Sequence, residues 1–209
     1  MEYIIDGIIT GVQQTGWLEW TAVVTGIMSV WFSSRENILV YPTGIISVLI
    51  YVYFGYTYLL YADMGVNAYY FIMSVYGWYH WTQTDDSNKD QIPVTTNNQR
   101  EHIISLFILV SSFLILAFVL SQFTDSDVPY WDATTTCFAI LGMWLMARKK
   151  LESWIAWIVT NLISIPLYFY KGLVLTSFQF LIFTIIAIVG YFAWKRSLEK
   201  EQNDLILAI

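Results

Sequence analysis

The sequence predicts an all-α membrane protein in which seven transmembrane helices form two parallel three-helix repeats joined by a linker helix. The first observation behind this is composition. Of the 209 residues, 57% are hydrophobic and only 12% are charged, about half the charged share of a soluble domain. The second is a set of seven apolar segments, and the third is a segregation of basic residues between them. A chain of this size folded in water could not bury so much apolar side chain.

Seven segments are long and apolar enough to cross a bilayer, which requires roughly 20 residues of helix. Some of them qualify only when interfacial aromatic residues are counted. In chain order the segments are Gly16–Phe32, Thr43–Leu60, Val66–Trp81, Ile103–Phe123, Ala133–Met146, Trp154–Tyr170 and Ser177–Trp194. The fourth is the cleanest, and the fifth is short, with a start at or just before Asp132.

Polar residues gather outside these segments. Thr82–Arg100 contains several acidic residues and is predicted to be a flexible loop that divides the chain. The residues after Trp194 are predicted to extend the last helix into water. The first fifteen residues carry Glu2 and Asp6 but no lysine or arginine, so we expect no cleaved signal peptide.

Basic residues gather on one side of the predicted bundle. With seven spans, the N-terminus and the segments near Tyr61–Gly65, Thr124–Asp132 and Lys171–Thr176 share one face, which holds a single basic residue, Lys171. The opposite face receives Arg35, Lys89, Arg100, Arg148, Lys149, Lys150, Lys195, Arg196 and Lys200. Because cytoplasmic loops are rich in lysine and arginine, we expect the N-terminus outside and the C-terminus in the cytoplasm.

The sequence also repeats itself. Ile45-Ile46-Ser47 with Tyr51-Val52-Tyr53 matches Ile163, Ser164 and Tyr168-Phe169-Tyr170 at a constant offset, and the glycine and tryptophan of Gly77–Trp81 recur in Gly190–Trp194. Chance similarity between aromatic-rich spans is the alternative. Parallel repeats are a known transporter plan, with sites between the repeats near the middle of the membrane. The predicted organisation is a first repeat over 1–81, a cytoplasmic loop over 82–102, a linker helix over 103–123, a second repeat over 124–196 and a cytoplasmic tail over 197–209.

The sixth span carries the candidate binding residues. Trp154, Trp157, Asn161, Ser164 and Tyr168 are spaced three or four apart and therefore share one helix face. An amide facing lipid would leave its donors and acceptors unsatisfied, so this face should meet protein, water or a ligand. An interfacial tryptophan belt with a helix–helix hydrogen bond is the alternative. It fits the first tryptophan but not the second or the asparagine, which lie deeper.

The third span offers a second set of polar and aromatic residues. Asn67 and Tyr70 lie on it at helical spacing, and the amide is a candidate for the same reason as that of the sixth span. Asp63, at the outer mouth, could attract a cation, although an exposed acid at an interface is the commoner case. Indole and phenol rings favour flat or cationic rings, so the site would suit such a ligand.

Charged side chains are absent from the interior of all seven predicted spans. Proton- or sodium-coupled carriers commonly keep a carboxylate there, at a free-energy cost that marks it as functional. We therefore expect neutral binding and passive movement, which is uniport. A retinal protein would need a lysine within the last helix, but Lys195 lies at its cytoplasmic end. A membrane enzyme would need acids or histidines at depth. A structural or assembly subunit stays possible.

The remaining chemically active residues predict no further site. His80 and His102 are far apart and lack a cysteine cluster, so we expect no metal. Cys137 is expected to be a packing residue. Asp132 is interpreted as a helix N-cap, and the basic run that begins at Arg148 as a topology anchor. No enzyme activity, cofactor or nucleic-acid partner is expected.

Several motifs in both halves resemble the PnuC family of vitamin transporters. In the first half they are Arg35-Glu36-Asn37, Tyr41-Pro42-Thr43-Gly44, Leu60-Tyr61-Ala62-Asp63-Met64 and Tyr76-Gly77-Trp78-Tyr79-His80-Trp81. In the second half they are Ala147-Arg148-Lys149-Lys150-Leu151-Glu152, Trp154-x-x-Trp157-x-x-x-Asn161 and Tyr170-Lys171-Gly172. The match covers nearly the whole chain apart from the Thr82–Arg100 loop and the tail.

The resemblance implies a seven-helix homotrimer in the bacterial inner membrane that takes up a B-vitamin precursor by facilitated diffusion. A separate cytoplasmic kinase then phosphorylates the solute and prevents its exit. In the family, the two tryptophans and the asparagine of the sixth-helix motif contact the substrate, here Trp154, Trp157 and Asn161. Members that carry nicotinamide riboside often have glutamine where this chain has Asn67, and some relatives with asparagine are associated with thiamine. Nicotinamide riboside is therefore the first expectation and thiamine the alternative.

Overall fold

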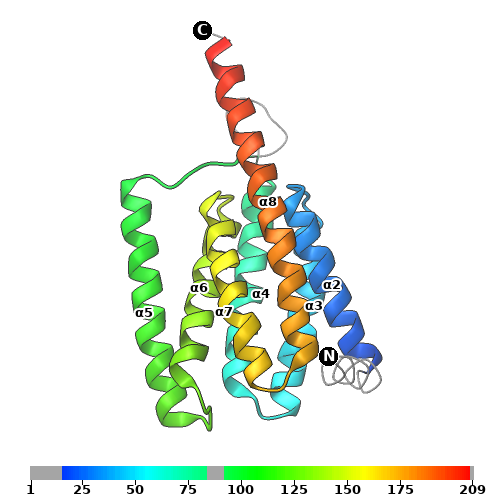
Figure 1. The fold of residues 1–209 in the computed structure, drawn as a ribbon. Helices are drawn as coiled ribbons and strands as arrows, with labels where there is room; N and C mark the ends of the chain where they lie inside the picture. The colour runs from blue at the N-terminus through cyan, green and yellow to red at the C-terminus, as the bar shows by residue number, and fades with distance from the viewer. Residues whose placement is uncertain (1–15, 84–91, 208–209) are drawn as a thin grey trace.

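The computed structural model describes residues 16–83 and 92–207, and within them the chain forms seven α-helices and no β-strand. They are α2 (Trp17–Ser34), α3 (Val40–Thr57), α4 (Tyr61–Trp81), α5 (Gln99–Phe123), α6 (Pro129–Ala147), α7 (Glu152–Tyr170) and α8 (Val174–Leu207). Each predicted span corresponds to one helix. The helices lie side by side, and α8 continues well beyond the others (Figure 1), as expected for the C-terminal extension.

Length and composition allow four of these helices to cross a membrane without further argument. These are α3, α5, α7 and residues Thr176–Asp204 of α8. The helices α2, α4 and α6 have similar lengths, of 18, 21 and 19 residues. They run alongside the other four in Figure 1. Large apolar side chains such as Leu106, Phe107 and Ile115 of α5 are more than half exposed, and lipid would cover them.

The bundle has two chemically different ends. At the first, which we call the basic end, α2, α4, α6 and α8 end or leave the bundle while α3, α5 and α7 begin (Figure 1). It carries Arg35, Arg100, the run from Arg148 to Lys150, and Lys195. At the opposite, acidic end, Lys171 is the one basic side chain among the described residues. The predicted charge segregation is therefore present in three dimensions, although Lys89 lies outside the described residues, as do Glu2 and Asp6.

The helices α2–α4 and α6–α8 are two copies of one arrangement, with equivalent residues 113 positions apart, the separation of Ser33 and Met146. Two pairs of left-handed backbone positions share this spacing. Glu36 (φ 54°) is equivalent to Lys149 (φ 56°), and Leu59 (φ 60°) to Gly172 (φ 76°). Between the copies, α2 packs on α8 and α6 packs on α4, which is the pattern of a pseudo-twofold axis. The linker α5 packs against α6 at the edge of the bundle (Figure 1).

This spacing corrects one predicted register. The pairing of Gly77 with Gly190 is kept, but Ser47 is equivalent to Thr160, one helical turn before the predicted partner Ser164. Apolar, aromatic and hydroxyl side chains recur every three or four residues along both helices. A shift of one turn therefore preserves much of the similarity, and the turn conformations rather than the side chains decide the register.

The left-handed turn at Leu59 leads to a prediction about stability. A non-glycine residue in this conformation costs about 1–2 kcal/mol, whereas the extra unfolded-state entropy of glycine costs about 0.5–1 kcal/mol. Leu59 is 67% exposed, so little packing is lost on truncation. We expect Leu59→Gly to stabilise the protein by roughly 0.5–1 kcal/mol, measured as a higher melting temperature in detergent.

The equivalent position provides the matched control. Gly172 has the same kind of backbone and no heavy atom within 4 Å of the place a methyl group would occupy. Gly172→Ala should therefore lower the melting temperature through backbone conformation alone. If both variants melt like the parent protein, the left-handed turns store no strain.

The segment before α5 is more ordered than the predicted loop over 82–102. Backbone hydrogen bonds join Thr95 to the turn between α6 and α7, from Thr95 N to the Lys149 carbonyl (3.2 Å) and from Leu151 N to the Thr95 carbonyl (2.9 Å). The buried Val94 packs beneath them. Asn98 caps α5 through a reciprocal capping box with Glu101, so the helix starts four residues before the predicted boundary at 103. Asp85, Asp86, Lys89 and Asp90 lie outside the described residues.

Two further interpretations are corrected by the packing. Asp132 is not an N-cap, because Val128 occupies that position. Instead it accepts hydrogen bonds from Lys171 Nζ (2.6 Å) and Ser126 Oγ (2.6 Å). The basic run is not merely a surface anchor, because Lys149 is 2% exposed and forms an ion pair with Glu36 (3.0 Å). A buried lysine needs such a partner.

Candidate functional site

The candidate site is built around the α7 stripe, which consists of Trp154, Trp157, Asn161, Ser164 and Tyr168. Helical spacing places all five on one face of α7, which packs against α6 and α8. Trp154, Asn161 and Ser164 are buried, while Trp157 and Tyr168 are partly exposed. The stripe thus faces protein rather than lipid, as predicted for a helix with an amide at membrane depth.

Trp157 joins the two repeats in the middle of the bundle. Its ring centroid lies 6.4 Å from that of Tyr70 on α4, with the planes at 61°. On its other side it covers Gly142 of α6, where a methyl group would come within 3.0 Å of Trp157 Cε2. The glycine lets the indole lie flat against the α6 backbone and holds its plane. Two of the predicted residues, from different repeats, are thereby brought together.

Asn161 and Ser164 are polar groups without partners. They are 3% and 1% exposed, and among the described residues neither side chain forms a hydrogen bond. The fully buried side-chain atoms that lack a partner among the described residues do not include those of Asn161 or Ser164, so a ligand or water can still reach and bind these two groups. One turn of helix separates the pair, and Trp157 lies one turn further on the same face. This combination of an indole, an amide and a hydroxyl can bind a flat, hydrogen-bonding ring.

Asn67 and Tyr168 occupy less central positions. The Asn67 side chain donates from Nδ2 to the carbonyl of Asp63 one turn earlier (2.9 Å), so part of its amide is already used. Tyr168 stacks on Phe180 of α8, with centroids 5.1 Å apart and planes at 12°. Among the described residues, no hydrogen bond joins Asn67 to the α7 stripe, and the sequence spacing could not have decided this.

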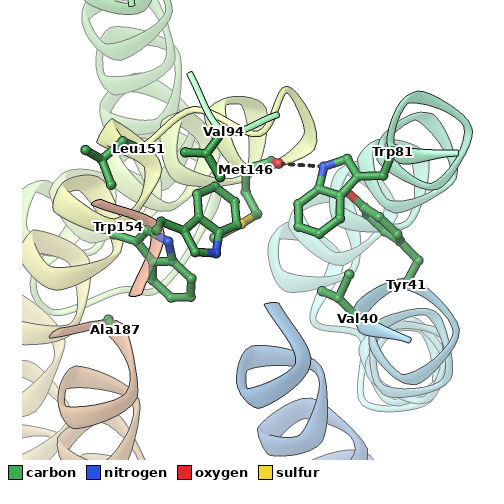
Figure 2. Close-up of a cluster of buried hydrophobic side chains, with 9 residues drawn as sticks. Val40, Tyr41, Trp81, Val94, Met146, Leu151, Trp154 and Ala187 are labelled. Carbon is green, nitrogen blue, oxygen red and sulfur yellow. Dashed lines mark hydrogen bonds between the residues drawn. The ribbon is translucent and has the colours of Figure 1, made fainter. Parts of the chain in front are cut away.

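Trp154 belongs to a separate cluster at the basic end, which sequence reasoning missed. We call Tyr41, Trp81, Trp154 and Trp194 the aromatic layer; each is at most 2% exposed. Figure 2 labels Tyr41, Trp81 and Trp154 together with Met146, whose carbonyl accepts a hydrogen bond from Trp81 Nε1 (3.2 Å). The indole nitrogen of Trp154 is buried and has no partner among the described residues. The glycine and tryptophan that recur at the end of α4 and where α8 leaves the bundle were the available signal.

The middle of the bundle carries no ionic group. In the described helices, aspartates, glutamates, lysines and arginines are confined to first turns and to α8 after Trp194. Within residues 16–83 and 92–207 no group of three histidine, cysteine or acidic side chains could hold a metal ion. Two surface hollows of about 400 Å³ lie on the outer face of α8 and beside Lys171, and neither includes a residue of the stripe.

The minor predicted residues lie where packing explains them. His80 stacks on Tyr76, with centroids 5.8 Å apart and planes at 7°, near the basic end. Cys137 is buried and its thiol donates to the Thr134 carbonyl (3.1 Å), consistent with a packing residue. Asp63 lies in the first turn of α4 at the acidic end.

Comparison with known proteins identifies transporters throughout. A family model described as nicotinamide mononucleotide transporter matches residues 16–196. The nicotinamide riboside transporter PnuC of Escherichia coli (strain K12) is 23% identical, covering 90% of this chain and 88% of that protein. The protein of the same name from Neisseria mucosa is 26% identical, covering 96% and 80%. The riboflavin/roseoflavin transporter RibM of Streptomyces davaonensis is 24% identical, covering 91% and 90%.

A solved structure has the same fold. The crystal structure of the vitamin B3 transporter PnuC matches with a TM-score of 0.71 and 24% sequence identity, covering 95% of this chain and 89% of that chain. Together with the helices described above, this likeness confirms the predicted all-α fold of seven transmembrane helices.

Proposed function

The chain belongs to the nicotinamide mononucleotide transporter family, the PnuC transporters that its motifs resemble, and we propose that it is a uniporter for nicotinamide riboside. The family and its solved relative are transporters rather than enzymes or structural subunits. The proposed route runs between the two repeats, and the proposed contacts are Trp157, Asn161, Ser164 and Tyr70, with Trp154, Tyr168 and Asn67 at its ends.

The observation that carries this proposal is the pair of unpartnered polar side chains beside Trp157. Nicotinamide riboside presents a pyridinium ring, a carboxamide and ribose hydroxyls. An indole face attracts a cationic ring by about 0.5–2 kcal/mol, and the Asn161 amide and Ser164 hydroxyl can bind the polar substituents. The contact of Trp157 with Tyr70 (6.4 Å) joins the two repeats, and this supports the proposal because transporters of this plan bind their solutes between repeats.

Passive movement fits the absence of ionic groups along the middle of the described helices. A carrier without an intramembrane carboxylate has no evident site for a coupling proton or sodium ion. Accumulation of the vitamin would then depend on phosphorylation by a cytoplasmic kinase. We also propose the bacterial inner membrane as location and a homotrimer as the assembly. Because lysine and arginine gather at the basic end, that end would face the cytoplasm, with the N-terminus outside.

Thiamine is the second candidate, favoured by Asn67 where nicotinamide riboside carriers of the family often have glutamine. Its thiazolium ring is also cationic and flat, so the α7 stripe accommodates either vitamin. The RibM relative is named for riboflavin, which has a neutral ring system. A comparison of all three vitamins therefore separates a preference for cationic rings from a preference for any flat ring.

Uptake into proteoliposomes that contain no kinase tests the proposal. We expect radiolabelled nicotinamide riboside to enter until its internal concentration equals the external one, because the carrier only equilibrates the solute. Imposing a proton or sodium gradient should leave that plateau unchanged. Thiamine and riboflavin are measured in parallel, and empty liposomes provide the background.

Each outcome has a distinct meaning. Saturable entry of thiamine alone would replace the substrate but keep the mechanism. Accumulation above the external concentration, driven by an ion gradient, would refute passive transport. Failure of all three vitamins to enter would refute the site.

A further inference from the structure

The aromatic layer follows the pseudo-twofold axis in detail. Tyr41 and Trp154 are equivalent residues at the starts of α3 and α7, and each meets the equivalent tryptophan of its own repeat edge-on. The Tyr41–Trp81 centroids are 5.3 Å apart with planes at 88°, and the Trp154–Trp194 centroids 5.5 Å apart, also at 88°. The Trp81 and Trp194 rings then meet each other across the axis, 5.7 Å apart.

Hydrogen bonds cross the axis in the same reciprocal way. Trp81 Nε1 at the end of α4 donates to the carbonyl of Met146 at the end of α6 (3.2 Å). Trp194 Nε1 at the turn where α8 leaves the bundle donates to the carbonyl of Ser33 at the end of α2 (2.9 Å). The acceptors are themselves equivalent, and Ser33 Oγ lies 2.9 Å from Met146 Sδ. A tryptophan of each repeat thus donates a hydrogen bond to a carbonyl at the end of a helix in the other repeat.

An ion pair completes the closure. Lys149 Nζ lies 3.0 Å from a carboxylate oxygen of Glu36, donates to the Ile92 carbonyl (2.7 Å) and sits 5.1 Å from the ring centroid of Trp81. The lysine is 2% exposed and the glutamate side chain 25%. Glu36 and Lys149 are equivalent positions in the two repeats, so one acid and one base face each other across the axis. The segment 92–98, which we call the strap, contacts the lysine of this pair through the Ile92 carbonyl.

The packing at this end differs from that in the middle of the bundle. Every residue of the aromatic layer is at most 2% exposed, whereas Trp157 and Tyr70 between the repeats are partly exposed. A solute at the α7 stripe could therefore reach the basic end only after the aromatic layer and the ion pair separate. An ion pair formed by one residue from each repeat separates when the repeats move apart, without unfolding either of them.

We propose that the basic end is a gate, closed in this structure, and that the Glu36–Lys149 ion pair is its latch. The aromatic layer fills the space between the repeats and blocks the passage of a solute. The strap holds the lysine through the Ile92 carbonyl. The inference rests on the proposed transport between the repeats, and it assigns Glu36 and Lys149 a role in opening rather than in substrate contact. Breaking the latch shifts the population toward the open state.

The population of the open state can be measured by how fast a thiol on the inner side of the gate reacts with a reagent added outside it. Ala187 of α8 is 1% exposed and belongs to the same buried cluster as the aromatic layer, two helical turns before Trp194 and therefore nearer the middle of the bundle. Ala187→Cys is made in a Cys137→Ala background, and labelling by a membrane-impermeant maleimide is timed from each side of sealed vesicles. With the latch intact we expect slow labelling from the basic end. Glu36→Lys, which leaves two cations facing each other, should speed it by about tenfold or more.

The repeat symmetry supplies the rescue variant. Both positions have left-handed backbones (φ 54° and 56°), so the double variant Glu36→Lys/Lys149→Glu rebuilds the ion pair with its ends exchanged. We expect labelling to return to within about threefold of the parent rate, not fully, because the bond to Ile92 is lost. Glu36→Gln is the milder single variant, should Glu36→Lys fail to fold.

The outcomes separate a gate from a merely structural contact. Single variants that lower the melting temperature but leave the labelling rate unchanged would overturn the proposal, as would fast labelling in the double variant. No vitamin is present in the labelling assay. A failure of the proposed substrate therefore leaves this test intact, and a failure of the latch leaves the uptake measurement intact.

Discussion

Replacing Trp157 with alanine is expected to weaken vitamin binding by roughly ten- to a hundredfold and to slow uptake in proportion. The indole offers a large aromatic face one helical turn from Asn161, on the same side of α7 as Ser164. Stacking of a flat ring on such a face contributes about 1–3 kcal/mol, and each 1.4 kcal/mol corresponds to about tenfold in affinity. Titration calorimetry with nicotinamide riboside and thiamine measures the loss.

The control for this variant is the same substitution at a tryptophan that lies outside the site. Trp31 of α2 is 46% exposed and lies against Arg35, whose guanidinium carbon is 4.6 Å from its ring centroid. Trp31→Ala removes an equal volume from the lipid-facing side and should leave affinity within about twofold of the parent. Equal affinities for Trp157→Ala and the parent protein would exclude the α7 stripe as the binding site.

Gly190→Ala is expected to destabilise the protein by about 1–3 kcal/mol, the usual cost of overpacking a tightly filled core. A methyl group there would lie 2.6 Å from Trp154 Cη2 and Cζ2, and the indole cannot retreat because Trp194 packs on its edge. Gly77→Ala should act in the same way, since its methyl group would meet the Tyr41 ring. The destabilisation of both variants is measured as a lower melting temperature in detergent.

Gly65 provides a control in which the sign reverses. It also lies within a helix, α4, but nothing is within 4 Å of the place its methyl group would occupy. Alanine is favoured over glycine in a helix interior by about 0.5–1 kcal/mol, so Gly65→Ala should raise the melting temperature slightly. If Gly190→Ala also raised it, the contact between Trp154 and α8 described above would be wrong.

The helices and the α7 stripe could be predicted because they depend on local periodicity. A span needs only length and apolar composition, and the spacing of Trp157, Asn161 and Ser164 fixes their common face without knowledge of the neighbours. The segregation of basic residues likewise follows from the order of the spans. Opposite the stripe, spacing places both Asn67 and Tyr70 on α4, but only the fold shows that the Tyr70 ring meets Trp157.

The packing at the basic end could not be predicted, because it depends on contacts between distant segments. Lys149 looks like a surface charge in sequence, and only the fold brings Glu36 and the Ile92 carbonyl to its ammonium group. The order of the strap cannot be predicted from local sequence, because it comes from two backbone hydrogen bonds to the α6–α7 turn. The spacing of Trp154 predicts a place in the stripe, whereas its contact with Trp194 holds it in the aromatic layer.

An acid and a base face each other at equivalent positions across the pseudo-twofold axis. This pairing means that the two halves of the chain cannot be identical copies. Two identical three-helix halves would place either two glutamates or two lysines at these positions, and like charges in a buried contact repel. The halves have therefore become complementary rather than interchangeable, like the two different subunits of an obligate heterodimer. Neither half can dimerise with itself to give this closed end, so α5 maintains a one-to-one pairing by joining the two unlike halves in a single chain.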